Sequence, residues 1–399
     1  MSHWECYGHE ESRRLSEVLK LKKSHPLVGH LEAERRIMLG CLNKEQMLMN
    51  VVPFIMGRLP DPLKSPERIQ KRLKLFYGQL SAKRLGKAFD KETHDVPWDA
   101  RNVIKRRAES LHECDVRTSV LAHLRDEQRR RLELYRDGLK VVPIPSEHRA
   151  DEIAAALHEA YPWMELATTT IWHALRRSVV RGDPGVRLPP ILLDGGPGVG
   201  KSRYGRHLSS LIGLPSMVVE ASTENASFGL VGTQRGWGTA APGRLVNHLM
   251  QSGIANSLVV VDEIEKAGAP RSTKGISYSL SESLLPLFEP LTSGRWTCPF
   301  YEIPFDMSWV VWILTSNNAS LLPEPLLSRC PPISVPAPST AQLKQFARWC
   351  GRERSLSDAS IDAVCEAIHR VASRQNVDLR RVARMLDRAE TLEGRPPLH

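Results

Sequence analysis

The feature that most constrains this chain is a glycine-rich loop that follows an apolar run at 191–193 and precedes an amphipathic segment starting at Arg203. The loop reads Gly195, Gly196, Pro197, Gly198, Val199, Gly200, Lys201 and Ser202. A strand, such a loop and a helix together aim backbone N–H groups and the positive end of a helix dipole at one anion. A turn that merely capped a helix would need neither the lysine nor the serine. The sequence therefore predicts a phosphate-binding loop.

The last two residues of the loop indicate its ligand. In loops of this pattern the lysine reaches the β- and γ-phosphates of a nucleoside triphosphate, and the hydroxyl ligates Mg²⁺. We therefore expect Lys201 to bind phosphate and Ser202 to bind the metal, with ATP and Mg²⁺ as the ligands.

Residues 1–150 differ from the rest of the chain in charge. They contain 30 Lys and Arg against 21 Asp and Glu, a net of +9, whereas residues 151–399 contain 25 against 24. Apolar residues spaced three and four apart predict helices over 13–23, 31–49, 66–89 and 102–135, and no strand pattern is visible. We expect a basic, mostly helical N-terminal region, which ends at a hinge marked by Pro143 and Pro145.

Two basic clusters in this region allow two interpretations. They are 105–107 and 129–131, and either could contact the phosphates of nucleic acid. Acidic residues such as Glu127 and Glu133 interleave the second cluster, which is also typical of a solvated helix face. A nucleic-acid partner is therefore one of two alternatives for the N-terminal region.

From residue 151 the pattern changes to short apolar strands that alternate with helices. Strands are predicted at 191–193, 217–220, 258–261, 309–314 and 333–335, and helices at 341–349, 358–372 and 379–389. Strands that are apolar throughout, separated by helices, indicate a parallel sheet covered on both faces. The predicted fold class is α/β, with a five-stranded parallel sheet in an α/β nucleotide-binding subdomain over 151–336 and a helical lid over 337–399.

Two acids end the predicted strand at 258–261. At the carboxyl edge of a parallel sheet, Asp262 is suited to hold Mg²⁺ and Glu263 to orient and deprotonate the attacking water. A polar amide, Asn317, follows the strand at 309–314 and can help to place that water. Helix capping and a strand-ending turn are the ordinary alternatives for these residue types.

Two arginines further along complete the set of candidates. Arg329 ends a short leucine-anchored helix, from which it can reach the γ-phosphate of a neighbouring subunit in a ring. Arg380 begins a lid helix, for which Asp378 is a plausible cap, and can bind phosphate from above.

In this order the pieces resemble an AAA+ ATPase with its Walker A, Walker B, sensor 1, arginine finger and sensor 2 motifs. The runs at 283–290, 300–308 and 322–329 are similar to motifs of the ATPase module of Lon proteases, and the resemblance covers about 185–390. It implies a homo-oligomer, for which we expect a hexameric ring that hydrolyses ATP to remodel or translocate a macromolecular substrate. A protein substrate or partner protein is the first expectation. A nucleic-acid-associated ATPase and a nucleotide-dependent regulatory switch are the alternatives.

A substrate-gripping loop is also implied by the resemblance. Trp237, followed by Gly238, stands where Lon has an aromatic and an aliphatic residue, so Trp237 is the candidate pore aromatic. The alternative is a tryptophan packed into a glycine-rich turn. Tyr161 and Trp163 offer a similar choice, because the pair can stack on adenine or pack at a helix start.

Other features set the expected context. No Ser–Lys dyad or second domain corresponds to Lon's proteolytic domain, so we expect a motor without intrinsic protease activity. The seven cysteines are widely spaced, which favours reduced thiols. No apolar run reaches 18 residues and no signal-peptide pattern is visible, so we expect a cytoplasmic location and no membrane partner.

Overall fold

The computed structural model describes residues 50–86, 88–89, 96–222, 226–235, 240–267, 279–373, 375 and 377–394. The helices expected at 13–23 and 31–49 lie outside these residues, as do Trp237 and Gly238. None of the described helices is long and apolar enough to cross a membrane.

A five-stranded parallel sheet forms the centre of the fold, as the sequence predicts. Its spatial order is β4-β5-β8-β3-β9, so the strand before the glycine-rich loop lies between β8 and β9. The strands are β3 (Ile191–Asp194), β4 (Ser216–Glu220), β5 (Leu258–Asp262), β8 (Val311–Ser316) and β9 (Pro332–Ser334). Leu193 pairs with Thr315, and Val261 pairs with Leu314. The carboxyl ends of β3, β5 and β8 therefore meet at one edge.

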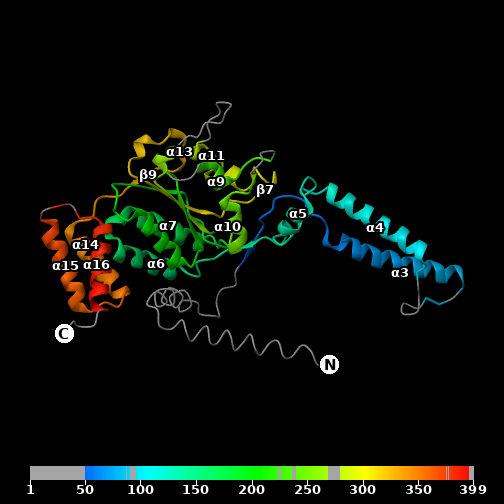
Figure 1. Cartoon of the computed structure of the whole chain (residues 1–399), viewed down its shortest axis with the longest axis horizontal. Helices are drawn as coiled ribbons and strands as arrows, with labels where there is room; N and C mark the ends of the chain where they lie inside the picture. Colours follow the sequence, from blue (N-terminus) through cyan, green and yellow to red (C-terminus); the bar gives the residue numbers. More distant parts are fainter. Residues whose placement is uncertain are drawn as a thin grey trace, which may run out of the picture. The chain divides into compact units, whose positions relative to one another are not determined.

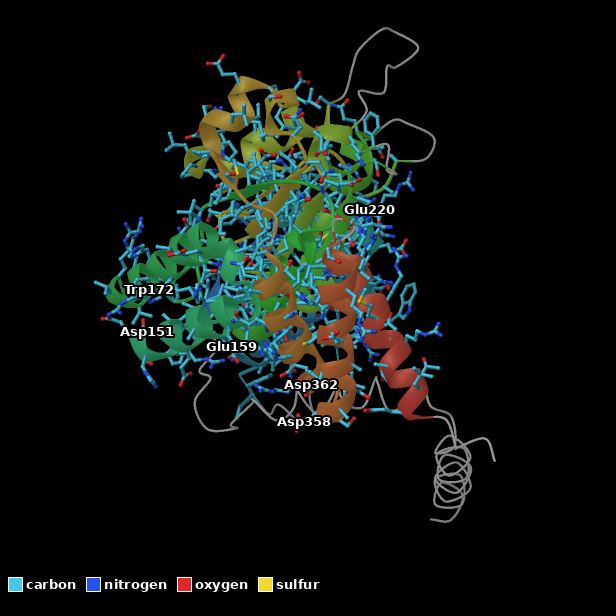
Figure 2. All side chains as sticks on the ribbon, turned by 90° about the vertical axis from the view of Figure 1, so that its left-hand side faces the viewer. Asp151, Glu159, Trp172, Glu220, Asp358 and Asp362 are labelled. Atoms are coloured by element: carbon cyan, nitrogen blue, oxygen red, sulfur yellow. The ribbon has the colours of Figure 1, made fainter. Side chains whose placement is uncertain are left out.

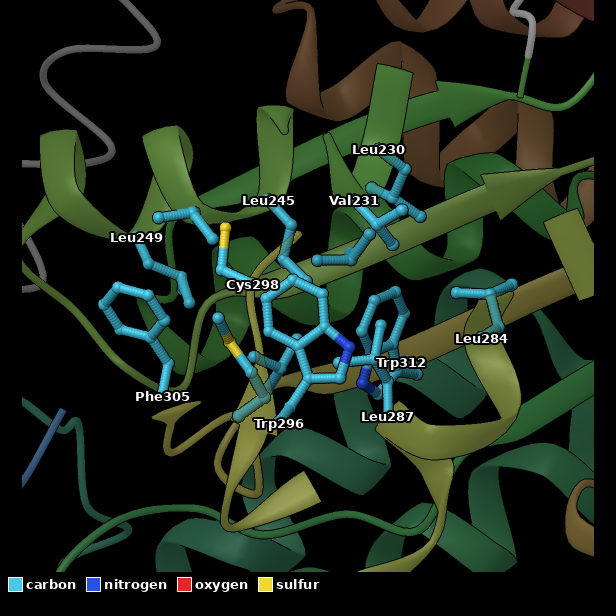
Figure 3. Packing of buried hydrophobic residues seen from close by; sticks show 14 of the residues in the cluster. Leu230, Val231, Leu245, Leu249, Leu284, Leu287, Trp296, Cys298, Phe305 and Trp312 are labelled. Carbon is cyan, nitrogen blue, oxygen red and sulfur yellow. The ribbon is translucent and has the colours of Figure 1, made fainter. Parts of the chain in front are cut away.

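Alternate residues of the strands pack into two separate cores. On one face, Val259 and Trp312 pack with α9 (Ala226–Val231), α10 (Arg244–Ser252) and α11 (Leu280–Phe288). Figure 3 shows leucines of α10 and α11 around Trp296 and Trp312 on this side. On the other face, Val260 and Ile313 pack with three helices of the opposite layer. These are α6 (Glu147–Ala160), α7 (Glu165–Val180) and α8 (Lys201–Ile212).

Polar contacts also join the helices of the second layer. The indole Nε1 of Trp172 on α7 donates to Asp151 on α6 at 2.6 Å, and Figure 2 labels both side chains. Arg176 donates to the same carboxylate at 3.1 Å and lies over the Trp172 ring. The two helices are thus fixed to each other outside the core as well as inside it.

Three helices follow the sheet and form the predicted lid. They are α14 (Thr340–Glu353), α15 (Asp358–Ala372) and α16 (Leu379–Glu393), drawn in orange and red in Figure 1. Each begins at a side chain that caps its first turn: Ser339, Ser357 and Asp378. Their buried faces join the same core as α6, α7 and α8.

The described part of the N-terminal region is mostly helical, as predicted, but two expectations for it were wrong. The helix expected over 102–135 is two helices, α4 (Trp98–Arg117) and α5 (Asp126–Glu133). Ser119 donates to the carbonyl of Val116 and accepts from the N–H of Leu121, a local turn that replaces the helical pattern. The region also contains strands, because β1 (Val51–Val52) pairs with β2 (Leu139–Lys140). Two-residue strands are too short to leave an alternating pattern.

Both ends of this region pack against the sheet-bearing part of the chain. The ring centroids of Phe54 and Phe305 are 4.7 Å apart. Leu121 and Val141 are buried in the same core as Trp312. Between these ends, α3 (Pro66–Arg84) packs against α4 as a two-helix hairpin. The remaining short elements are α12 (Pro290–Ser293), β6 (Trp296–Thr297), β7 (Pro304–Phe305), α13 (Glu324–Arg329) and four single-turn 3-10 helices at Pro62–Lys64, Pro162–Met164, Ile264–Lys266 and Ala319–Leu321.

Candidate nucleotide-binding site

The glycine-rich loop connects β3 to α8 and is in contact with the lid. Gly198 and Gly200 have φ values of 78° and 96°, in the left-handed region that favours glycine. A Cβ on Gly198 would lie 2.6 Å from the Oδ2 of Asp378, and one on Gly200 would lie 2.5 Å from a methyl of Leu379. The N–H of Leu379 donates to the Gly198 carbonyl at 3.0 Å. These glycines therefore permit both the loop conformation and the close approach of α16.

Lys201 is buried and faces back into its own loop. Its Nζ donates to the carbonyls of Gly195 at 2.7 Å and Gly196 at 3.0 Å, and to the Oδ1 of Asn317 at 3.1 Å. Burial lowers the pKa of Lys201, against the opposing attraction of nearby carboxylates, chiefly Asp262. The ammonium thus fills the loop that is predicted to hold phosphate.

Ser202 and Asp262 bring two oxygen ligands together. The Ser202 hydroxyl donates to the Oδ1 of Asp262 at 2.7 Å. The Thr315 hydroxyl donates to the same oxygen, and it accepts from the N–H of Glu263 at 3.0 Å. Oxygen donors from a hydroxyl and a carboxylate are the set that Mg²⁺ prefers. Thr315 was not predicted as a site residue, and its position directly before the polar stretch at 316–318 is the available signal.

Glu263 has a constrained backbone and a tethered side chain. Its φ of 53° is unusual for a residue other than glycine. One carboxylate oxygen accepts from the Nζ of Lys266 at 2.8 Å, and the other accepts from the Nδ2 of Asn317 at 3.3 Å. The hydrogen bond from Lys266 is the main cause that lowers the pKa of Glu263. The carboxylate is therefore held in its ionised form.

Asn317 is oriented by Glu265, a residue that sequence analysis missed. The Oε1 of Glu265 accepts from both the backbone N–H and the Nδ2 of Asn317, at 3.1 Å and 2.9 Å. Because the Nδ2 of Asn317 donates to Glu265 and Glu263, the amide oxygen of Asn317 faces Lys201. The Oε2 of Glu265 is buried and has no hydrogen-bond partner among the described residues. The only sequence signal was a third acid two residues after Glu263.

These groups surround a cavity of about 290 Å³. Lys201, Ser202, Asp262, Glu263 and Asn317 all line it. Three arginines line it as well, Arg380 from α16 and Arg203 and Arg206 from α8, and the guanidinium of Arg203 also donates to the Sγ of Cys350 at 3.0 Å. The two arginines of α8 were not predicted as site residues, although their spacing of three puts them on one helix face. The cavity thus combines the glycine-rich loop, cations and acids at one sheet edge.

Arg329 is the candidate that the structure keeps apart. It ends α13 and does not line the cavity of its own chain. Its Nε donates to Glu289 at 3.2 Å, and one of its terminal nitrogens donates to the Pro325 carbonyl at 3.0 Å. Its side chain is 36% exposed.

Tyr161 and Trp163 are buried behind the loop. The Trp163 indole donates to the Val199 carbonyl at 3.0 Å, and Tyr161 packs edge-on to Tyr204 with ring centroids 5.4 Å apart. Burial raises the pKa of Tyr161 to about 12. Neither ring lines the cavity, so in this structure the pair supports the loop from behind.

Comparison with known proteins agrees with this arrangement. Residues 191–335 match the model of the ATPase family associated with various cellular activities (AAA). The Lon protease of Desulfovibrio desulfuricans is 27% identical over 213 residues, which are 50% of this chain and 24% of that protein. The mitochondrial Lon protease homologue of Oryza sativa subsp. japonica is 29% identical over 199 residues, covering 47% of this chain and 19% of the homologue.

A third relative shows the same partial coverage. The mitochondrial Lon protease homologue of Yarrowia lipolytica is 32% identical over 139 residues, which are 35% of this chain and 12% of the homologue. The chain thus spans about a quarter or less of the length of these relatives. The AAA match and the α/β architecture coincide in the region that carries the cavity. Residues 191–335 thus have the fold of the AAA family, and this part of the chain is similar in sequence to the Lon proteases.

Proposed function

We propose that this chain hydrolyses ATP in a Mg²⁺-dependent reaction and uses the energy to remodel or translocate a macromolecule, most directly a protein. The observation that carries the proposal is the hydrogen-bonded set at the sheet edge. In it, Lys201 bonds to Asn317, and Asn317 bonds to Glu263. A phosphate-binding cation, a polar amide and an ionised carboxylate are thus linked in one cavity.

The residues divide the chemistry among them. Lys201 exchanges its two loop carbonyls for phosphate oxygens, because a charged acceptor forms a stronger hydrogen bond than a neutral carbonyl. Glu263 orients a water molecule and accepts its proton, while Asn317 fixes the direction of attack. Arg380, with Arg203 and Arg206, stabilises the negative charge that develops on the phosphate oxygens.

Ser202 and Asp262 are the residues that would hold Mg²⁺. Their oxygens already lie 2.7 Å apart and face the cavity, and an ionised carboxylate with a hydroxyl fits the donor preference of this ion. Mg²⁺ held by these two residues would neutralise negative charge on the phosphate oxygens. Thr315 keeps the carboxylate of Asp262 in place through its hydroxyl.

We also propose that the chain acts as a homo-oligomeric, hexameric ring. Arg329 supports this arrangement, because it lies outside the cavity of its own chain and is partly exposed. A guanidinium placed in this way can serve the cavity of a neighbouring subunit, where it stabilises transition-state charge. Trp237 remains the proposed pore aromatic of such a ring.

Nucleic acid is the second candidate target, and one observation favours it. The helices α3 and α4 carry eleven Lys and Arg against five Asp and Glu, a net of +6. Counterion release makes contacts of such a surface with DNA strongly salt-dependent. ATPase stimulation by duplex DNA that vanishes at high salt would favour this candidate, and stimulation by an unfolded protein such as casein would favour the first. Loss of casein in the same reactions would contradict the expected absence of protease activity.

A cytoplasmic location is part of the proposal. The described cysteines, which include the buried Cys298 and Cys330, are free thiols, as expected in a reducing compartment. Fractionation of cells that express a tagged chain tests the location.

The decisive test is the steady-state rate of ATP hydrolysis with and without Mg²⁺. We expect turnover only with the metal, no nucleotide binding in Lys201→Ala, and ATP binding with a rate at least 100-fold lower in Glu263→Gln. A Glu263→Gln protein as fast as the wild type would remove Glu263 from its proposed role. A wild-type chain that neither binds nor hydrolyses ATP would overturn the proposal.

A further inference from the structure

The helical hairpin of α3 and α4 contains a second cavity, larger than the one at the glycine-rich loop. This hairpin groove has a volume of about 720 Å³. Ile69, Leu73 and Phe76 of α3 and Leu111 of α4 line it with apolar surface. Nothing in the proposed ATPase chemistry uses this groove.

One end of the hairpin groove is fixed by a buried carboxylate. Asp115 accepts from Arg58 at 2.6 Å, from Lys64 at 3.1 Å, and from the backbone N–H of Asp61 at 2.6 Å. These partners use both oxygens of a side chain that is 2% exposed. These bonds tie α4 to the segment at 58–64 that leads into α3, so one end of the groove is already formed when a ligand arrives.

The apolar wall of the groove is not covered by the described part of the chain. Phe76 is 58% exposed and Leu111 is 39% exposed. Leu80, one turn after Phe76 on the same face of α3, is 40% exposed. Adjacent apolar side chains that remain in water around a cavity are typical of a protein-binding surface.

Charge restricts the kind of protein that fits. Arg72 lines the groove, Arg68 lies one turn before it on α3, and Arg107 lies one turn before Leu111 on α4. All three are exposed, and no salt bridge joins them to a carboxylate among the residues that the structure describes. A second hairpin of the same charge would be repelled, whereas an acidic ligand would be attracted.

We propose that the hairpin groove binds an amphipathic helix of another protein, one with an apolar stripe flanked by acidic residues. Such a helix covers Phe76 and Leu111 with its stripe and pairs its carboxylates with Arg72 and Arg107. Duplex DNA would use the cations alone and leave the apolar wall in water. The inference does not depend on ATP hydrolysis, and its test measures binding only.

The test uses the full chain and fluorescence anisotropy with three labelled probes. The first is an 18-residue designed helix with leucines at positions i, i+3 and i+4 and glutamates beside them. The second is the same peptide with lysine in place of glutamate, and the third is a 20-base-pair DNA duplex. We expect the acidic helix to bind at least ten-fold more tightly than the basic helix at low salt, with the difference shrinking as salt is added.

Variants locate the binding to the groove. Phe76→Ser should weaken binding of the acidic helix about ten-fold, because the apolar contact is lost. Arg72→Glu should weaken it and reduce its salt dependence. Matched controls are Leu291→Ser, at an apolar side chain that is 88% exposed on α12, and Arg348→Glu, at an exposed arginine of α14. Both controls should bind as the wild type does.

Three results would overturn the inference. They are equal binding of the two peptides, tighter binding of the duplex than of the acidic helix, and equal effects of Phe76→Ser and Leu291→Ser. Because Phe76 is more than half exposed, its replacement should leave the fold intact, which circular dichroism checks. ATPase activity, measured on the same samples, reports separately on the proposed function.

Discussion

Lys266 holds the carboxylate of Glu263 in an ion pair, with 2.8 Å between Nζ and Oε2, one turn along the chain from it. The bond occupies one of the two oxygens with which Glu263 would accept a proton from water. It also lowers the pKa of Glu263, so the carboxylate stays ionised to a lower pH than it would without Lys266.

Removal of this lysine should therefore shift the pH dependence of hydrolysis. In Lys266→Ala the pKa of Glu263 rises toward its ordinary value, so activity is lost at a higher pH on the acidic side of the profile. Lys266→Arg keeps a cation in place and serves as the control. A pH–rate profile of kcat checks this, and an acidic limb that moves to lower pH, or not at all, would contradict the role of the ion pair.

Glu265 should act as a positioning residue for Asn317. Glu265→Ala leaves the amide of Asn317 free to rotate, so we expect kcat to fall about ten-fold while ATP affinity changes little. Glu265→Gln keeps an acceptor oxygen and should retain most of the rate. Rates and nucleotide affinity are measured together with the thermal unfolding midpoint. An equal loss of kcat in the alanine and glutamine variants would show that an acceptor oxygen at position 265 does not position Asn317 for the reaction.

Gly198 should be intolerant of a side chain, and Gly196 offers a matched comparison in the same loop. Gly198→Ala forces a left-handed alanine and a Cβ within 2.6 Å of Asp378, whereas a Cβ on Gly196 meets nothing within 4 Å. We expect Gly198→Ala to lower the free energy of unfolding by roughly 1–2 kcal/mol and to weaken nucleotide binding. Gly196→Ala should change stability little. Thermal unfolding measures the stability of both variants, and nucleotide titration measures their affinity. Equal stability and equal affinity of the two variants would argue against lid contact at Gly198.

Arg329 should act across a subunit interface. Arg329→Ala protein, mixed into wild-type rings, should lower ATPase activity more than dilution predicts, because each variant subunit removes a cation from its neighbour's cavity. Glu289→Ala is the control, since it breaks the ion pair with Arg329 but keeps the guanidinium. A loss only proportional to the fraction of variant would contradict action across an interface, and no loss at all would place Arg329 outside the reaction.

Fold class was accessible from the sequence because its signals are local. The loop at 195–202 lies between an apolar strand and a helix, and each strand of the sheet is a short apolar run that needs burial on both faces. Asp262 and Asn317 follow two such runs, so their meeting at one edge follows from the parallel topology.

Contacts between distant segments were decided by the tertiary structure alone. No local pattern indicates that Glu265 orients Asn317, that Asp378 and Leu379 approach the glycines of the loop, or that Phe54 packs against Phe305. The break after α4 combines the local turn at Ser119 with the burial of Leu121 and Leu124 in the core beside the sheet.

The sequence by itself thus determined the sheet edge at which the candidate residues Lys201, Asp262, Glu263 and Asn317 meet. Tertiary structure decided their state: Lys201 directed into its own loop, Glu263 tethered to Lys266, and Arg329 kept away from the cavity of its own chain. The physical reason is that residue type and strand periodicity are written in neighbouring positions. Burial, hydrogen-bond direction and charge pairing depend on which segments the fold brings into contact.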